Sequence, residues 1–132
     1  MLDHLTFRAM EKALDAAVLR QRVIANNIAN ADTPGFKRSD VRFESLLRAE
    51  LEGRGGLVGL RTDPRHIPIG SAGLPEPEVV TDRRTVMNNN LNNVDIDAEM
   101  SALAANQLRY NVLVQQVSHE IRLLRTAIGG RP

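Results

Sequence analysis

Residues 96–128 read IDAEMSALAANQLRYNVLVQQVSHEIRLLRTAI. In this stretch one stripe of side chains recurs at alternating steps of four and three residues, which places the stripe on one face of an α-helix. The stripe consists of Ile96, Met100, Leu103, Gln107, Tyr110, Val114, Val117, Ile121, Leu124 and Ile128. A strict seven-residue period is typical of helices that supercoil around a partner helix. The stretch therefore predicts one long helix that needs helical partners.

A second stretch near the amino end repeats this pattern. Its stripe consists of Phe7, Met10, Leu14, Ala17, Gln21, Ile24, Ile28 and Ala31. Together the two stretches predict a mainly α fold, in which long N- and C-terminal helices pack as an antiparallel coiled-coil-like pair. Further apolar side chains lie outside both stripes and would remain exposed on such a pair, which predicts lateral neighbours. They are Val18, Leu19, Val23, Leu108, Val112, Leu113 and Leu123.

Each stripe contains one polar residue, Gln21 in the first and Gln107 in the second. A polar residue in such a stripe costs stability but can fix the register of the two helices. In an antiparallel pair the two amides lie at similar distances from the chain ends, so they can meet. The alternative is that each amide only tolerates contact with water.

Turn residues divide the chain into four parts. We expect an N-terminal axial helix over residues 1–31, and a signature turn with a short helix over residues 32–52. A loop-rich middle with room for a small β-hairpin near Val79 follows over residues 53–93, and a C-terminal axial helix over residues 94–130. Asp40 is the predicted N-cap of the short helix, and Asn93 or Asp95 that of the last. Pro34-Gly35 suits the middle of a type II turn.

Composition excludes several classes of protein. The chain has 132 residues, which suits one domain, and it has no Cys and no Trp. Its 17 basic and 16 acidic residues are nearly balanced and dispersed, so nothing favours nucleic-acid binding. No apolar run is long enough to span a membrane, and charged residues near the amino end argue against a secretory signal peptide.

Catalytic and metal-binding readings find little support, so we predict no enzyme, no catalytic residue, no cofactor and no metal site. His4, His66 and His119 lack the spacing of metal ligands. Asp95, Asp97 and Glu99 alternate like cation ligands, but they open a helix, where acidic residues stabilise the positive end of the dipole. The glycines of residues 53–56 resemble a phosphate loop only superficially, because no Gly-Lys-Ser/Thr follows.

The motif ANNIANADTPGFKR at residues 25–38 resembles the signature of bacterial flagellar axial proteins, the rod, hook and hook-associated subunits. Segments 93–100 and 106–128 are similar to those of proximal rod subunits, and the similarity covers nearly the whole chain. Residues 88–91 depart from the shorter, Gly-containing turn expected in that group. The signature residues of the motif are Asn26, Asn27, Ile28, Asn30, Asp32, Thr33, Pro34, Gly35 and Phe36.

The resemblance implies a structural subunit of the proximal rod of the bacterial flagellar basal body, in the periplasmic space. It implies export in an unfolded state by the flagellar type III apparatus, without a cleaved signal peptide. Terminal helices that are disordered in the free monomer would then polymerise and transmit torque from motor to hook. The implied partners are other copies, the rod subunits FlgC, FlgF and FlgG, the adaptor FliE, the export gate and the MS ring.

The residues themselves leave some questions open. Asn26, Asn27 and Asn30 either tie the Thr33-Pro34-Gly35 turn to a neighbouring subunit or form an intramolecular helix cap. A soluble helical adaptor or export chaperone is an alternative function, and it would be a stable dimer at low concentration. A helper of cell-wall glycan hydrolysis is a second alternative, and it would need two convergent carboxylates in a pocket.

Overall fold

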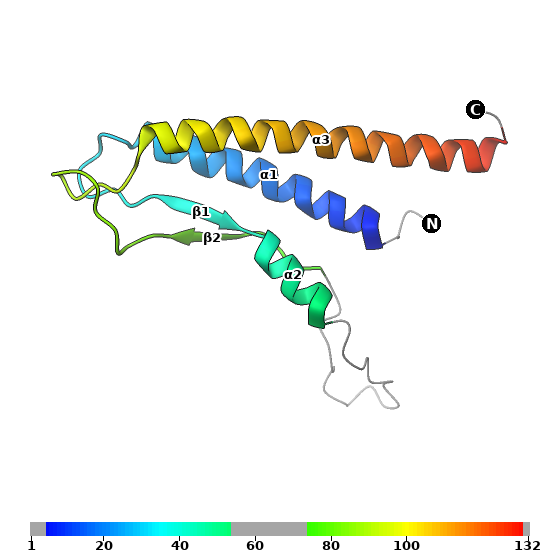
Figure 1. Ribbon diagram of the computed structural model, residues 1–132, viewed down its shortest axis with the longest axis horizontal. Coiled ribbons are helices and arrows are strands. Elements are labelled where there is room, and N and C mark those ends of the chain that lie inside the picture. The colour runs from blue at the N-terminus through cyan, green and yellow to red at the C-terminus, as the bar shows by residue number, and fades with distance from the viewer. Residues whose placement is uncertain (1–4, 54–73, 131–132) are drawn as a thin grey trace.

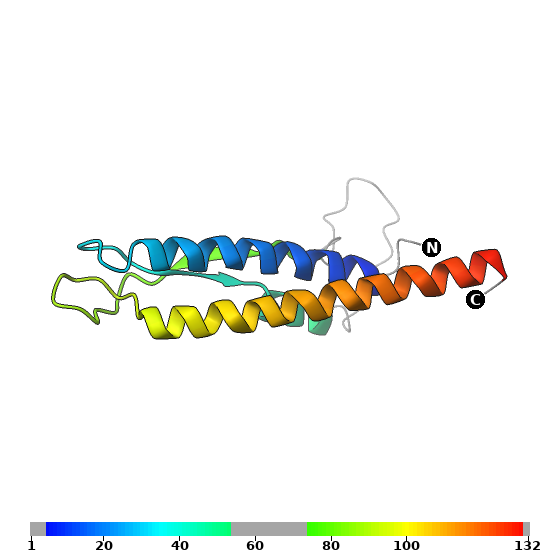
Figure 2. The same cartoon turned by 90° about the horizontal axis from the view of Figure 1, so that it is seen from above.

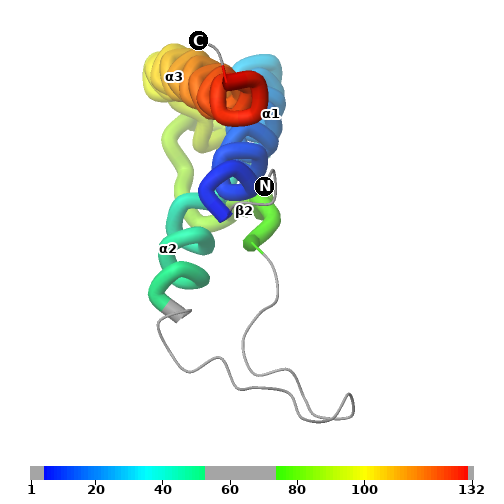
Figure 3. The backbone as a smooth tube through the Cα atoms, turned by 90° about the vertical axis from the view of Figure 1, so that its right-hand side faces the viewer, coloured from blue at the N-terminus to red at the C-terminus, as the bar shows by residue number. Residues whose placement is uncertain are grey.

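The computed structural model describes residues 5–53 and 74–130. Its elements are α1 Leu5–Ala29, β1 Ser39–Arg42, α2 Glu44–Gly53, β2 Glu78–Thr81 and α3 Ile96–Gly129. α1 and α3 run side by side in opposite directions, and the small sheet and α2 lie beneath the pair (Figures 1 and 3). The predicted fold class is confirmed: the protein is mainly helical, with packed terminal helices, a short middle helix and a two-stranded sheet.

Local chemistry explains where the helices begin and end. Asp95 is the N-cap of α3, and its side chain accepts hydrogen bonds from the backbone N–H groups of Asp97 and Ala98. Gly130, in the left-handed region at φ 61°, ends the helix and donates to the Thr126 carbonyl. After α1, Phe36 N–H donates to the Thr33 carbonyl at 3.2 Å. With Gly35 at φ 70°, this closes the type II turn that the Pro-Gly pair predicts.

The sheet differs from the sequence prediction. β2 pairs with β1 in antiparallel register, from Ser39 opposite Thr81 to Arg42 opposite Glu78, instead of folding on itself as a local hairpin. The prediction of Asp40 as a helix N-cap was wrong, because Asp40 lies within β1 and α2 begins four residues later, at Glu44. Asp40 Oδ1 instead accepts from the adjacent Val41 N–H at 2.7 Å.

The buried core is small and contains several polar side chains among its apolar ones. Its apolar members are Met10, Ala16, Ala17, Ile24, Val41, Phe43 and Val94. Its polar members are Asn27, Asn92, Asn93, Glu99 and Asn106. Buried polar groups are costly unless they are hydrogen-bonded, so the partners of these five side chains determine how the elements are held together.

The face of α3 that packs on α1 is rotated about the helix axis relative to the predicted stripe. On α3, Leu103, Tyr110, Val117 and Leu124 are less exposed, as predicted, but Met100, Gln107, Val114 and Ile121 are exposed. The residues one place earlier, among them Glu99, Asn106 and Leu113, take the inward positions. This amounts to a rotation of the stripe by roughly 50°, half the angle between successive residues.

The same displacement places both stripe glutamines outside the helix contact. Gln21 and Gln107 are exposed, and Gln107 donates to Asn111 one turn later on α3. The pairing of Gln21 with Gln107, which the sequence left open, is therefore not the contact that joins α1 to α3. Asn27 and Asn106 supply the polar contacts between these helices instead.

Candidate assembly site

The signature motif forms the end of the molecule where α1 stops and α3 starts, which we call the tip, residues 26–38 and 82–96 (Figures 1 and 2). Asn30 Nδ2 donates to the Asn26 carbonyl at 2.8 Å and to Asn26 Oδ1 at 3.1 Å. Thr33 Oγ1 donates to Asn30 Oδ1 at 3.2 Å. These three side chains form an intramolecular cap on the last turn of α1, one of the two roles that the sequence left open.

Asn92 holds the carboxyl end of α1. Its Nδ2 lies 2.9 Å from the carbonyl oxygens of Asn30, Ala31 and Thr33, while its Oδ1 accepts from Val94 N–H at 2.6 Å. A helix leaves its last carbonyls without intrahelical partners. In α1 those carbonyls accept from the backbone N–H groups of Asn30 and Ala31, and the fully buried Asn92 holds the carbonyls of the turn that follows, from a segment far away in sequence.

Asn93 and Lys37 extend the tip network to the neighbouring loop. Asn93 Oδ1 accepts from Arg38 N–H at 2.6 Å, and its Nδ2 donates to the Asp82 carbonyl at 2.9 Å. Lys37 Nζ donates to the carbonyls of Thr85 and Leu91 at 2.9 and 2.7 Å. The two halves of the tip are thus joined by side-chain bonds to backbone groups, so the loops have defined positions despite little apolar burial.

Asn27 and Glu99 join three elements at one buried point. Asn27, 0% exposed, donates from Nδ2 to the Ser39 carbonyl at 2.8 Å and to Glu99 Oε2 at 3.1 Å, and its Oδ1 accepts from Ser39 N–H at 3.0 Å. Arg38 Nε donates to Glu99 Oε1 at 2.7 Å. Glu99 is therefore more than the dipole-stabilising acid expected at a helix start, because it is the buried anion that links α3 to α1 and β1.

Asn106 provides a second polar contact along the helix pair. Its Nδ2 donates to the Ala17 carbonyl of α1 at 2.9 Å. Ala16 and Ala17 are almost fully buried, and such small residues allow α3 to approach the backbone of α1. Each polar contact matches one position on α1 with one on α3, so together they specify a single antiparallel register.

Glu44 ties the start of α2 to both long helices. Its carboxylate accepts two hydrogen bonds from Arg20 of α1, at 3.0 and 2.7 Å, and one from Arg109 of α3, at 3.0 Å. Partial burial alone would raise the pKa of the Glu44 carboxyl. The hydrogen bonds from Arg20 and the charges of both arginines outweigh burial and lower that pKa below its ordinary value of 4.5.

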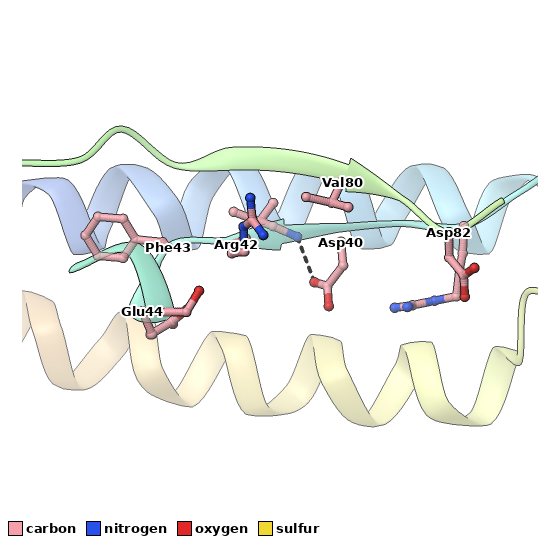
Figure 4. Close-up of a pocket in the computed structure, with 9 residues that line it drawn as sticks. Asp40, Arg42, Phe43, Glu44, Val80 and Asp82 are labelled. Carbon is pink, nitrogen blue, oxygen red and sulfur yellow. Dashed lines mark hydrogen bonds between the residues drawn. The ribbon is translucent and has the colours of Figure 1, made fainter. Parts of the chain in front are cut away.

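A pocket of about 600 Å³ lies between the sheet and the start of α2, and it contains the carboxylates of Asp40, Glu44 and Asp82 (Figure 4). Glycoside hydrolysis needs one carboxyl whose raised pKa lets it donate a proton. The pKa of Glu44 is lowered, and hydrogen bonds from Thr85 and from backbone N–H groups lower that of Asp82. Glu44 and Asp82 therefore lack the raised pKa that a general acid needs, and they do not support the glycan-hydrolysis alternative.

The outward face of α3 carries large apolar side chains that nothing in the described chain covers. Leu108 is 67% exposed, and Met100, Val112, Val114, Ile121 and Leu123 are exposed as well. We call these six residues the outer apolar face. Several large exposed apolar side chains on one helix indicate a site of protein contact. Several members belong to the stripe read from the sequence, so the heptad pattern here marks a face that is free in the single chain.

The signature residues divide into structural and exposed groups. Asn27 is buried, and Ile28, Asn30 and Phe36 are partly buried. Asn26, Asp32, Thr33, Pro34 and Gly35 are exposed at the tip. In the first stripe, Ile24 is buried, Phe7 and Leu14 are partly buried, and Gln21 is exposed.

Sequence reasoning missed Asn92, Arg38 and Asn106 as structural residues, and it considered Asn93 only as an N-cap, a role that Asp95 takes instead. The available signal was a run of asparagines directly before the N-cap Asp95, a position where such residues bond to backbone. His4, His66 and most of residues 53–56 lie outside the described residues, and His119 is exposed. Within residues 5–53 and 74–130, no three His, Asp or Glu side chains converge as a metal site would need, and no helix is both long and apolar enough to cross a membrane.

Comparison with known proteins points in one direction. Residues 7–37 match the family described as flagella basal body rod protein. Over 125 residues the chain is 38% identical to the flagellar basal body rod protein FlgB of Bacillus subtilis, covering 95% of this chain and 94% of that protein. It is 36% identical to FlgB of Proteus mirabilis, with 97% and 98% covered, and 30% identical to FlgB of Salmonella typhimurium, with 98% and 99% covered.

Proposed function

The chain belongs to the family of the flagellar basal body rod protein FlgB, and from this membership we propose that it polymerises into the proximal rod through its two terminal helices. As a member of that family it is a structural subunit of the basal body rod and not an enzyme. A rod subunit assembles with copies of itself and with other basal body components.

The outer apolar face of α3 is the observation that carries the proposal. Leu108, Val112 and Met100 are more than half exposed, on a helix whose opposite side already packs on α1. Fully burying one such side chain stabilises a contact by about 1.5–3 kcal/mol. Several burials on each subunit add up to a strong lateral contact in which no single bond carries the torque.

The tip and the terminal helices have separate roles in this assembly. The helices of residues 1–31 and 94–130 form the wall of the rod, with Met100, Val114 and Ile121 among the contact residues. The exposed signature residues, Pro34 and Gly35 above all, form a contact with a neighbouring subunit. The small sheet and α2 lie beneath the helix pair, outside this wall (Figure 1), and residues 54–73 of the predicted loop-rich middle lie outside the described residues.

Family membership supports a proposed location and proposed partners for the subunit. The subunit is exported by the flagellar type III apparatus, without a cleaved signal peptide, and the rod stands in the periplasmic space. Its neighbours are FlgC, FlgF and FlgG, with FliE, the export gate and the MS ring at the base. A chain without disulfides and with only 3% aromatic residues has few features that would resist unfolding for export.

An assembly subunit and an adaptor or export chaperone differ in their behaviour on dilution. The first experiment is circular dichroism and light scattering of the purified chain across concentration. An assembly subunit gains helix as it polymerises or as other rod subunits are added. A compact helical monomer or dimer that melts cooperatively at low concentration would instead favour the adaptor.

Charge placed on the outer apolar face tests the proposed contact directly. Leu108→Glu with Val112→Glu should abolish assembly, because each carboxylate would have to be desolvated in the lateral contact. Val79→Glu with Val86→Glu is the matched control, since both are exposed apolar side chains outside α3 and the added charge is equal. Equal loss of assembly in the two double variants would contradict a role for this face.

The signature turn is tested by a change that keeps α1 intact. We expect Pro34→Ala with Gly35→Val to weaken rod assembly more than export, because Val is strained at the φ of 70° that Gly35 adopts. Gly35→Asn is the control, since Asn tolerates this conformation. Swimming motility and secreted subunit are the two measurements. Normal motility of the double variant would sink the proposed role of the turn.

A further inference from the structure

The tip contains a pocket that the proposed lateral contact does not use. It has a volume of about 410 Å³ and lies between the carboxyl end of α1 and the start of α3. Ile28, Met87 and Ile96 supply apolar lining, and Asp32 and Asp95 supply carboxylates. Its size is at the lower end of the range of ligand pockets.

Charge at this pocket is negative. Asp32 is exposed on the signature loop, and Asp95 is only partly buried where it caps α3. Asp97, exposed in the first turn of α3, adds a third carboxylate beside them. Lys37, which belongs to the same tip, is not among the lining residues and donates to the carbonyls of Thr85 and Leu91. An occupant should therefore be apolar and carry positive charge.

The opposite end of the molecule has these properties. Ile128, in the last turn of α3, is 81% exposed. Arg125 lies three residues earlier and Arg122 one turn before that, and both are exposed. No acidic residue lies between Ile121 and Gly130. The end of α3 is thus an aliphatic side chain next to two cations.

These two surfaces cannot meet within one molecule. They lie at opposite ends of α3, with the tip at one extreme and the C-terminal turns at the other (Figures 1 and 2). A helix of 34 residues separates them by about 50 Å at a rise of 1.5 Å per residue. Complementary surfaces at opposite ends form a heterologous contact, and such contacts generate open-ended chains of subunits.

We propose that the tip pocket binds the C-terminal turn of α3 from a second copy of this chain, with Ile128 in the pocket and Arg125 facing Asp32 and Asp95. This inference rests on the proposed assembly function and adds to it an axial contact, distinct from the lateral contact of the outer apolar face. Because each tip binds only the C-terminal end of α3 from the next copy, all subunits in a row point the same way.

Cysteine trapping tests the contact, because the chain has no cysteine of its own. The full chain with Ile96→Cys and Ile128→Cys, oxidised at high concentration, should give a ladder of disulfide-linked oligomers on a non-reducing gel. The control carries Val86→Cys and Ile128→Cys, which places the first thiol at a similarly exposed site outside the tip pocket and outside α3. A ladder only in the first variant supports the proposal, whereas equal ladders or none overturn it.

Charge reversal provides a second readout that does not depend on thiols. Asp32→Lys and Arg125→Glu should each raise the protein concentration needed for half-maximal assembly by about fivefold. This is the effect expected when one surface ion pair becomes a repulsion. A chain with both reversals should regain assembly. Failure of the double variant to recover would overturn the axial contact. If all of these variants still assemble through the outer apolar face, the axial contact is wrong and the proposed function stands.

Discussion

Removing the Asn27 amide should destabilise the fold more than any other single change in the signature. Asn27→Ala deletes three hydrogen bonds, which leaves the Ser39 N–H, the Ser39 carbonyl and Glu99 Oε2 without their partner. A buried group left without a partner costs about 1–3 kcal/mol. The Glu99 side chain is only 2% exposed and belongs at the upper end of that range, whereas Ser39 is partly buried and belongs at the lower end.

The expected loss is about 3–6 kcal/mol of unfolding free energy, a large part of the about 5–15 kcal/mol of an ordinary domain. Urea unfolding of the assembled chain, followed by circular dichroism, measures it, because the assembled state is the one in which the proposed function has both long helices folded. Asn26→Ala is the matched control, because Asn26 is the neighbouring exposed asparagine and its side-chain oxygen accepts only the secondary bond from Asn30. Asn26→Ala should cost less than about 1 kcal/mol. A cost below about 1 kcal/mol for Asn27→Ala as well would refute the role of this buried junction.

Two further changes probe single features. Leu91→Gly should raise stability by up to about 1 kcal/mol, because Leu91 holds a left-handed φ of 64°, which costs a non-glycine residue about 1–2 kcal/mol; a lowered urea midpoint would contradict this. The Glu44 carboxyl, whose pKa is lowered, stabilises the fold above pH 4.5 and loses that contribution as the pH falls through its folded pKa. Glu44→Gln should therefore flatten the decline of stability below pH 4.5, by less than about 1 kcal/mol because the group is half exposed, and an unchanged pH profile would count against the pairing with Arg20 and Arg109.

Local chemistry made the helices and their ends predictable. Heptad spacing located both long helices, Asp95 gave the start of α3, and Pro34-Gly35 gave the turn after α1. Each of these signals acts within a few residues, so one sequence is enough to read it. The departure of residues 88–91 from the expected Gly-containing turn also has a structural counterpart, since Leu91 adopts the conformation that favours glycine.

Contacts between distant segments were harder to predict. The heptad pattern ranks side chains by hydrophobicity, but the α1–α3 contact includes Asn27, Glu99 and Asn106, which a hydrophobic pattern assigns to solvent. The apolar residues beside them are left for a contact outside the chain. The pairing of β1 with β2 joins segments more than thirty residues apart, and four-residue strands carry too little periodicity to predict such a pairing.

The polar interior also determines how the subunit responds to temperature. Unfolding raises the heat capacity in proportion to the apolar surface exposed and lowers it in proportion to the polar surface exposed. Four buried asparagines and a buried glutamate occupy much of an interior that has few large apolar side chains. The heat capacity change is therefore expected to fall below the about 12–15 cal/mol/K per residue of ordinary domains. The stability curve of the folded chain is correspondingly shallow, so its stability changes little between cold and warm surroundings.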